Sequence, residues 1–175
     1  MKIRPAVSGE FEMVRSFYHS VIDAMENAEY KPAWQKDIYP DPEFLRSSID
    51  NGELYIGFED GRLMSAMVLN HDCNDGYEKL SWEIRAERNE VLLIHALCIH
   101  PDFGGRGLGK ELVRFAQDLA KETGMKAMRL DVLAGNLPAE KLYPACGFKY
   151  LGTVNMFYED TGWVDFLLYE YKVQG

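Results

Sequence analysis

The segment from Val91 to Lys110 constrains the possible fold more than any other part of this 175-residue chain. It begins with nine residues, Val91 to Ile99, that carry no formal charge when His95 is neutral. A run of this length and composition is typical of a strand that is buried on both faces of a sheet. Pro101 lacks the backbone N–H that a sheet ladder requires, so we expect the strand to end just before it.

A glycine-rich loop follows this strand and leads into a helix. Glycine allows the backbone to approach a ligand closely, and the first N–H groups of a helix lie unpaired at the positive end of its dipole. Such a loop is a typical binding site for an anion, and phosphate is the usual one. The residues assigned to this site are Gly104, Gly105, Arg106, Gly107, Leu108, Gly109 and Lys110.

Three phosphate-binding motifs compete for this loop. The spacing from Gly104 to Lys110 fits the nucleotide-binding P-loop, but Glu111 stands where that motif needs Ser or Thr to hold Mg²⁺. The dinucleotide fingerprint G-x-G-x-x-G also fails, because Leu112 occupies the place of its third glycine. The third motif is a pyrophosphate loop with the pattern Arg/Gln-x-x-Gly-x-Gly/Ala, placed after a strand that ends near Val-x-Pro.

That third pattern belongs to the GNAT superfamily of acetyl-CoA-dependent N-acyltransferases, which this loop resembles. Ile99-His100-Pro101 is followed by Arg106, Gly107 and Gly109 at the matching places. Gly104 stands where the family usually has Arg or Gln. The resemblance therefore implies that acetyl-CoA binds here through the backbone donors, with one side-chain contact to the pyrophosphate missing.

Length, composition and charge exclude several classes of protein. A chain of this length, 47% apolar, predicts a single domain over residues 1–175. The net charge of −9 argues against nucleic acid as a partner. No apolar run reaches membrane-spanning length, and the first residues lack the apolar core of a signal peptide. Three cysteines, without metal-ligand spacing, predict a reduced, cytoplasmic protein that holds no metal.

Hydrophobic periodicity and turn residues give the order of elements β-α-α-β-β-β-α-β-α-β-β. Strands are expected over residues 2–7, 53–58, 63–69, 91–99, 127–133, 148–157 and 163–173. Helices are expected after a cap at Ser8, from Pro42 to Ile49, from Leu108 to a C-cap at Gly124, and from Pro138 to Cys146. The polar stretch 70–89 is expected to be a loop or an extended insertion.

This order resembles the GNAT fold over nearly the whole chain. The resemblance implies an α/β (α+β) fold with a mixed, mostly antiparallel sheet that is flanked by helices. It also implies that the strands at 91–99 and 127–132 splay apart. The pantetheine arm of acetyl-CoA would lie in that gap and pair with the backbone of Leu97, Cys98 and Ile99.

A second family segment begins at Asn136. The residues Asn136, Ala139, Leu142, Tyr143, Gly147 and Phe148 match the pattern N-x-x-A-x-x-L-Y-x-x-x-G-F without a gap. In GNAT enzymes the tyrosine of this segment lies beside the CoA sulfur, which implies that Tyr143 protonates the departing thiolate, and Asn136 is implied to contact the cofactor arm. The alternative is that Tyr143 packs a helix and Asn136 caps a turn.

His95 is the best candidate for the base that deprotonates an amine. Alternation along the strand places it on the face of Leu93, Leu97 and Ile99, and a histidine pKa near 6.5 suits proton acceptance at neutral pH. The segment resembles the arylalkylamine N-acetyltransferase branch, whose second histidine is replaced here by Leu93. The alternative is a hydrogen-bonded core histidine, and Glu83 is a rival base.

The acceptor pocket is predicted from aromatic residues in a loop. Trp34 and Tyr39 lie between two predicted helices, where they either line a pocket or pack in the core. Cys98 and Cys146 have no neighbour in sequence that would activate a thiol, so we expect them to be structural.

The sequence thus predicts an N-acetyltransferase that moves the acetyl group of acetyl-CoA to a small-molecule or peptide amine, by direct attack in a ternary complex. The alternative from another class is a non-catalytic acyl-CoA-binding sensor, which the loss of the usual Arg or Gln at Gly104 leaves open. The last two predicted strands could also pair with a second copy and form a homodimer.

Overall fold

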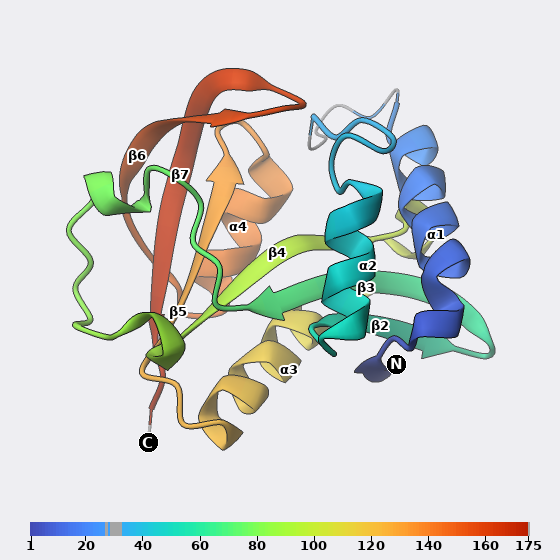
Figure 1. The fold of residues 1–175 in the computed structure, drawn as a ribbon, viewed down its shortest axis with the longest axis horizontal. Helices are drawn as coiled ribbons and strands as arrows, with labels where there is room; N and C mark the ends of the chain where they lie inside the picture. Colours follow the sequence, from blue (N-terminus) through green and yellow to red (C-terminus); the bar gives the residue numbers. More distant parts are fainter. Residues whose placement is uncertain (27, 29–32, 175) are drawn as a thin grey trace.

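The computed structural model describes residues 1–26, 28 and 33–174, and its centre is a seven-stranded sheet with the strand order β1-β2-β3-β4-β5-β7-β6 (Figure 1). The strands are β1 Lys2–Pro5, β2 Leu54–Glu59, β3 Arg62–Asn70, β4 Val91–Ile99, β5 Ala127–Leu133, β6 Lys149–Tyr158 and β7 Gly162–Lys172. All neighbours are antiparallel except β4 and β5, which are parallel. The predicted mixed, mostly antiparallel sheet is confirmed.

Four helices flank the sheet, and short 3₁₀ turns interrupt the connections. The helices are α1 Phe11–Ala24, α2 Pro42–Asp50, α3 Leu108–Glu122 and α4 Leu137–Ala145, and the 3₁₀ turns are Ser8–Glu10, Tyr77–Lys79, Arg88–Glu90 and Pro101–Phe103. The turn Tyr77–Lys79 lies within the stretch 70–89, and the turn Arg88–Glu90 lies at its end. Within the described residues, no helix is both long and apolar enough to cross a membrane.

The start of α1 differs from the prediction that Ser8 caps it. Ser8 instead begins a 3₁₀ turn, and its hydroxyl donates a hydrogen bond to Asp50 at 2.9 Å. The side-chain cap belongs to α2, where Asp41 accepts from the backbone N–H groups of Glu43 and Phe44. A serine before a helical pattern is ambiguous because a short turn can separate it from the helix itself.

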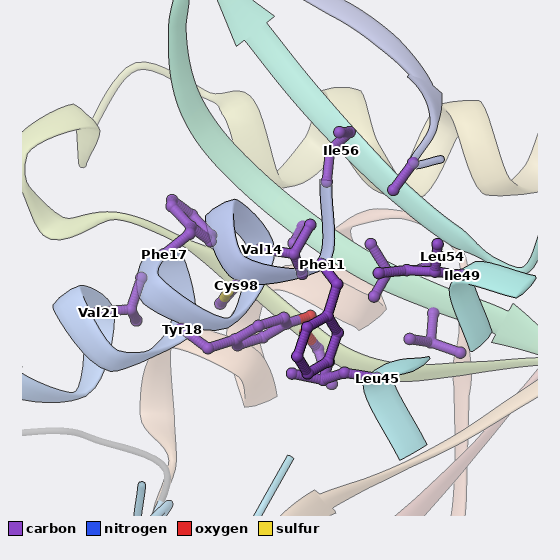
Figure 2. Packing of buried hydrophobic residues seen from close by; sticks show 14 residues of the cluster. Phe11, Val14, Phe17, Tyr18, Val21, Leu45, Ile49, Leu54, Ile56 and Cys98 are labelled. Atoms are coloured by element: carbon purple, nitrogen blue, oxygen red, sulfur yellow. The ribbon is translucent and has the colours of Figure 1, made fainter. Parts of the chain in front are cut away.

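Helices α1 and α2 lie side by side on one face of the sheet (Figure 1). Their apolar side chains pack against β2, β3 and β4, and Figure 2 shows Tyr18 of α1 close to Cys98 of β4 within this core. Helices α3 and α4 cover the opposite face, where Leu112 and Ala116 are fully buried against β4 and β5. The sheet is therefore enclosed on both faces, as the uncharged run from Val91 predicts.

A β-bulge interrupts the middle of β4. Val68 of β3 pairs with His95 and Ala66 pairs with Cys98, so two residues of β4 oppose one residue of β3. Ala96 adopts a positive φ of 48°, which a residue with a Cβ seldom does. The hydroxyl of Tyr18 donates to the Ala96 carbonyl at 2.9 Å, which ties α1 to the bulge.

The bulge changes which side chains share a face. Leu97 and Ile99 pack with the α3 and α4 core, whereas Cys98 packs with the α1 and α2 core. His95 lies on the α1 and α2 side, with its ring against Phe44 of α2. The prediction that His95 shares a face with Leu97 and Ile99 is wrong, because simple alternation fails where an extra residue enters the strand.

The strands β4 and β5 separate soon after they meet. Their parallel pairing covers only Val91 to Leu93 against Ala127 to Arg129, and the rest of β4 pairs with β3 alone. Figure 1 shows the two strands diverging from their common base. This confirms the predicted splay and leaves the backbone of β4 from Ile94 onward facing a gap.

Candidate active site

A cavity of about 110 Å³ lies in the gap between β4 and β5. Asn136, Ala139 and Tyr143 reach it from α4, on one face of the sheet. His95 and Asp131 line it from β4 and β5, on the opposite side. The splay therefore brings together residues that an unbroken sheet would keep apart.

His95 lines this cavity and carries an unsatisfied ring nitrogen. Its Nε2 atom is buried and has no hydrogen-bond partner among the described residues. Burial lowers the pKa of His95 below its ordinary value, and this effect outweighs the opposite influence of Asp131 and Asp72. The side chain is thus a neutral imidazole at pH 7, and the alternative of a fully hydrogen-bonded core histidine does not fit Nε2.

Tyr143 is buried, and the cavity reaches it. Its ring packs edge-on against Phe148, with centroids 5.6 Å apart, and lies 6.3 Å from Tyr169. Burial raises the pKa of Tyr143, and Asp131 and Cys146 raise it further. The hydroxyl therefore keeps its proton at neutral pH and is able to act as a donor. The ring of Tyr143 packs as the structural alternative predicts, whereas its hydroxyl remains available to a molecule in the cavity.

Asn136 occupies the N-cap position of α4 without capping it. Its side chain makes no capping hydrogen bond, although its backbone carbonyl accepts from Glu140 N–H at 3.0 Å. The carboxylate of Glu140 instead accepts from the N–H of Gly135 at 2.7 Å. Because the turn is held by Glu140, the amide of Asn136 is left to line the cavity.

The glycine-rich loop ends in an open helix terminus. Gly107 has a φ of 78° at the N-cap of α3, and among the described residues no side chain caps this end. The Cβ of any other residue at Gly109 would lie 3.2 Å from Leu142 and 3.4 Å from Ile99, so glycine here permits α3 to pack closely on α4 and β4. The free N–H groups of the first turn fit the pyrophosphate of acetyl-CoA.

The two cationic side chains of this loop are placed differently. Arg106 is about half exposed and forms an ion pair with Glu59 of β2, which lowers the pKa of that carboxyl group. Lys110 lies in the first turn of α3. Burial raises the pKa of Cys146 at the C-cap of α4, and the charge of Lys110 lowers that pKa by less. Gly104 has an ordinary φ of −58°, and a Cβ there would approach the Pro101 carbonyl at 3.1 Å.

Trp34 and Tyr39 serve both of the roles that were predicted as alternatives. Both line the cavity and both pack against the α1 and α2 core. Their rings lie 5.8 Å apart, and Tyr39 meets Tyr158 of β6 edge-on at 6.1 Å. Glu83, in contrast, is not in the cavity wall, and its carboxylate pairs with Lys149 of β6.

Asp131 is a cavity residue that sequence reasoning missed. One of its oxygens, Oδ2, accepts hydrogen bonds from the hydroxyls of Tyr77 and Tyr158 at 2.9 and 3.0 Å and from the amide of Asn74 at 3.0 Å. The signal available in the sequence was an acidic residue within the otherwise largely apolar strand Ala127–Leu133. A charge inside such a strand requires partners, and these come from two distant segments, the connection that holds Asn74 and Tyr77 and the strand β6.

The cysteines do not offer a nucleophile. Cys98 is buried in the α1 and α2 core, and burial raises the pKa of its thiol. Burial raises the pKa of Cys146 and of Cys73 as well. The thiols are therefore protonated at neutral pH and poorly nucleophilic. No group of three His, Cys, Asp or Glu side chains in the described part of the chain is placed to hold a metal ion.

Comparison with known proteins agrees with this fold. The model of the acetyltransferase (GNAT) family matches residues 19–148, and the chain belongs to that family. An uncharacterized N-acetyltransferase of Methanocaldococcus jannaschii is 36% identical over 78 residues, which are 45% of this chain and 31% of that protein. A streptothricin acetyltransferase of Streptomyces lavendulae is 34% identical over 73 residues, 42% of this chain and 39% of that protein. The chain thus spans less than half the length of these curated relatives.

Solved structures share the fold over almost the whole chain. A GNAT-family acetyltransferase of Streptococcus agalactiae superposes with a TM-score of 0.78 at 22% identity, covering 99% of this chain and 95% of the other. A proposed acetyltransferase of Salmonella typhimurium, solved with its cofactor acetyl-CoA, gives a TM-score of 0.71 at 17% identity over 99% and 94% of the two chains. At these identities the likeness establishes the fold.

Proposed function

We propose that this chain is an acetyl-CoA-dependent N-acetyltransferase that acetylates a primary amine while both substrates are bound. The observation that carries the proposal is the cavity between β4 and β5, which His95 and Tyr143 enter from opposite sides of the sheet. An unsatisfied neutral imidazole and a protonated phenol are the base and the acid that amide formation from a thioester requires. Membership in the acetyltransferase family supports the same reaction.

The residues of this chain have separate tasks in the proposed reaction. Nε2 of His95 accepts a proton from the amine, which is an ammonium ion in water because its pKa is about 10. The hydroxyl of Tyr143 gives its proton to the sulfur that leaves. Protonated, poorly nucleophilic thiols at Cys98 and Cys146 favour direct attack over an acyl-enzyme.

The binding of acetyl-CoA is assigned to three parts of the chain. The first turn of α3, from Gly107 to Lys110, would hold the pyrophosphate through its backbone N–H groups. The unpaired backbone of β4 near Leu97 and the amide of Asn136 would hold the pantetheine arm. When bound, acetyl-CoA supplies an activated thioester as the acetyl donor.

The test is to incubate the protein with acetyl-CoA and a panel of primary amines, and to follow both free thiol and acetylated amine. We expect thiol release that depends on the amine, with one acetylated amine formed per thiol. Binding of acetyl-CoA without thiol release, for every amine of the panel, would contradict the proposal and favour the acyl-CoA sensor.

A further inference from the structure

The cavity carries a negative charge that the protein does not balance. Asp131 forms no ion pair with the described residues, and no lysine or arginine among them lines the cavity. Its three hydrogen-bond donors, Tyr77, Tyr158 and Asn74, are all neutral groups. His95, the nearest basic side chain in the cavity, is held in its neutral form by burial.

The hydrogen bonds to Asp131 reach only one of its two carboxylate oxygens. All three reach Oδ2, and Oδ1 accepts none from the described part of the chain. A half-buried carboxylate loses hydration and normally regains stability from a cation. The second acid of the cavity wall, Asp160, is partly buried as well, and burial raises the pKa of its carboxyl group. The cavity lining therefore holds a carboxylate oxygen without a donor among the described residues, together with a net negative charge.

Aromatic rings form a continuous wall beside this carboxylate. Trp34 lies 5.8 Å from Tyr39, Tyr39 lies 6.1 Å from Tyr158, and Tyr158 lies 4.7 Å from Phe166. All four residues line the cavity, and the hydroxyl of Tyr158 donates to Asp131. Aromatic faces attract cations and cover the carbon atoms next to them, so the wall and the carboxylate favour the same kind of ligand.

We infer that Asp131 is the specificity-determining residue for the acceptor, and that it selects a primary amine that enters as a cation and has no carboxylate beside the amine. This inference rests on the proposed function for the identity of the reaction. Oδ1 of Asp131 receives the ammonium group, and the four rings cover the attached carbon atoms. One proton then passes from the ammonium nitrogen to Nε2 of His95, which leaves a neutral amine and an imidazolium ion. An acceptor with a carboxylate next to its amine is repelled by Asp131 and Asp160.

A binding experiment without acetyl-CoA tests the charge selection directly. The probes are choline, which carries a quaternary ammonium, and 3,3-dimethylbutan-1-ol, which has the same shape without the charge. We expect the parent protein to bind choline at least about tenfold more tightly, and we expect Asp131→Asn to reduce this difference strongly while acetyl-CoA affinity stays unchanged. Asp165→Asn, an exposed aspartate on β7, is the matched control and should keep the difference.

A kinetic comparison tests the selection against carboxylates. Phenethylamine and phenylalanine differ by one carboxylate, and we expect kcat/KM of the parent to favour phenethylamine by at least about tenfold, with a smaller ratio in Asp131→Asn. Equal binding of choline and 3,3-dimethylbutan-1-ol by the parent would overturn the inference, and this outcome does not depend on whether the Asn variant folds. A folded Asp131→Asn variant that still binds choline with the full parental preference would also overturn it. Since the binding test uses no acetyl donor, its outcome is independent of whether the protein proves to be an acetyltransferase.

Discussion

Two polar atoms in the cavity stand out at the scale of single residues. Buried polar atoms are nearly always hydrogen-bonded in native proteins, and an unsatisfied one costs about 1–3 kcal/mol. Nε2 of His95 is such an atom, and Oδ1 of Asp131 is a half-buried neighbour with no donor among the described residues. The two lie in the wall of one cavity, where a proton-bearing ligand would satisfy both of them.

His95→Ala is expected to lower kcat/KM most on the acidic side of neutrality. Burial lowers the pKa of His95, so its imidazole stays neutral to a lower pH than a free histidine, whose pKa is about 6.5. Near pH 6 the amine is almost fully protonated and depends most on this base, and the contribution of His95 is lost as the pH falls through its lowered pKa.

The measurement is kcat/KM against pH for parent and variant. His19→Ala is the matched control, because His19 lies on α1 and pairs with Asp37, away from the residues that line the cavity. Superimposable profiles of kcat/KM against pH for the parent and His95→Ala would show that His95 has a purely structural role.

Tyr143→Phe is expected to slow acetyl transfer while leaving acetyl-CoA affinity unchanged. The phenyl ring keeps the contacts with Phe148 and Tyr169, so only the proton donor is removed. Loss of a general acid costs about a hundredfold to ten-thousandfold in kcat. The loss should shrink with a thioester whose thiol is more acidic, since that leaving group needs less help.

Tyr169→Phe provides the comparison, because Tyr169 is a buried tyrosine that packs on Tyr143 without lining the cavity. It should retain the parental kcat. A Tyr143→Phe variant with parental kcat would remove this hydroxyl from the mechanism and leave solvent or substrate as the proton source.

At the scale of elements, strand β4 and the start of α3 supply different parts of the proposed site. The bulge at Ala96 puts Leu97 on the face opposite to His95, whose ring lies toward α2, and Tyr18 of α1 holds the bulge through its hydroxyl. The glycine loop then opens α3 directly after β4. One continuous stretch of chain therefore supplies the proposed base, the unpaired backbone edge and the proposed phosphate site.

Gly107→Asp is expected to weaken acetyl-CoA binding by at least about tenfold. It places a negative charge at the open end of α3, where the pyrophosphate is proposed to bind. Nothing lies within 4 Å of the Cβ that this change introduces, so direct steric disruption is not expected. Gly107→Asn has a similar shape without the charge and should lose less affinity.

Gly124→Asp is the matched control at the other end of α3. Gly124 also has a positive φ, 73°, with nothing within 4 Å of an added Cβ, so its backbone strain is similar and its charge is remote. The readout is the Kd for CoA by calorimetry. Parental affinity in a folded Gly107→Asp variant would place the phosphate site elsewhere. Gly109→Asp is less informative, because its Cβ would also press on Leu142.

At the scale of the whole molecule, acetyl-CoA is expected to stabilise the folded state. A ligand that binds only the folded protein adds about 2.7 kcal/mol to the free energy of unfolding at a hundred times its Kd. ATP with Mg²⁺ should add far less, because Glu111 replaces the Mg²⁺ ligand of a P-loop. Thermal unfolding with each ligand is the measurement, and a larger shift with ATP would contradict the assignment.

The elements of the fold were largely predictable because their signals are local. Apolar alternation, Asp60-Gly61 at a hairpin and Gly124 after α3 depend only on near neighbours in the sequence. The splay of β4 from β5 and the approach of Asn136 and Tyr143 to one cavity followed from the family resemblance. The segment from Asn136 to Phe148 matches the family pattern without a gap, and the glycine loop matches it except at Gly104.

Other features depend on partners that are distant in the chain. The bulge at Ala96 arises from the register with β3 and from Tyr18, which lies 78 residues away. The donors to Asp131 come from residues 74, 77 and 158, and the ion pair of Arg106 with Glu59 joins the glycine loop to the end of β2. No spacing rule in the sequence predicts such pairings, and therefore Asp131 was missed and the face of His95 was misplaced.

The gap through the sheet lies between two surfaces that come largely from different elements of the chain. The proposed acetyl-CoA site uses β4, α3 and α4, whereas the wall beside Asp131 comes from the segment around Trp34 and Tyr39 and from the β6–β7 hairpin, whose Asp160 carbonyl accepts from Gln35 at 2.8 Å. Substitutions at wall positions that contact neither β4, α3 nor α4 tend to be additive with changes in the donor site. Related chains could thus diverge in the amine they accept, through a few exchanges in this wall, while inheriting the donor site intact.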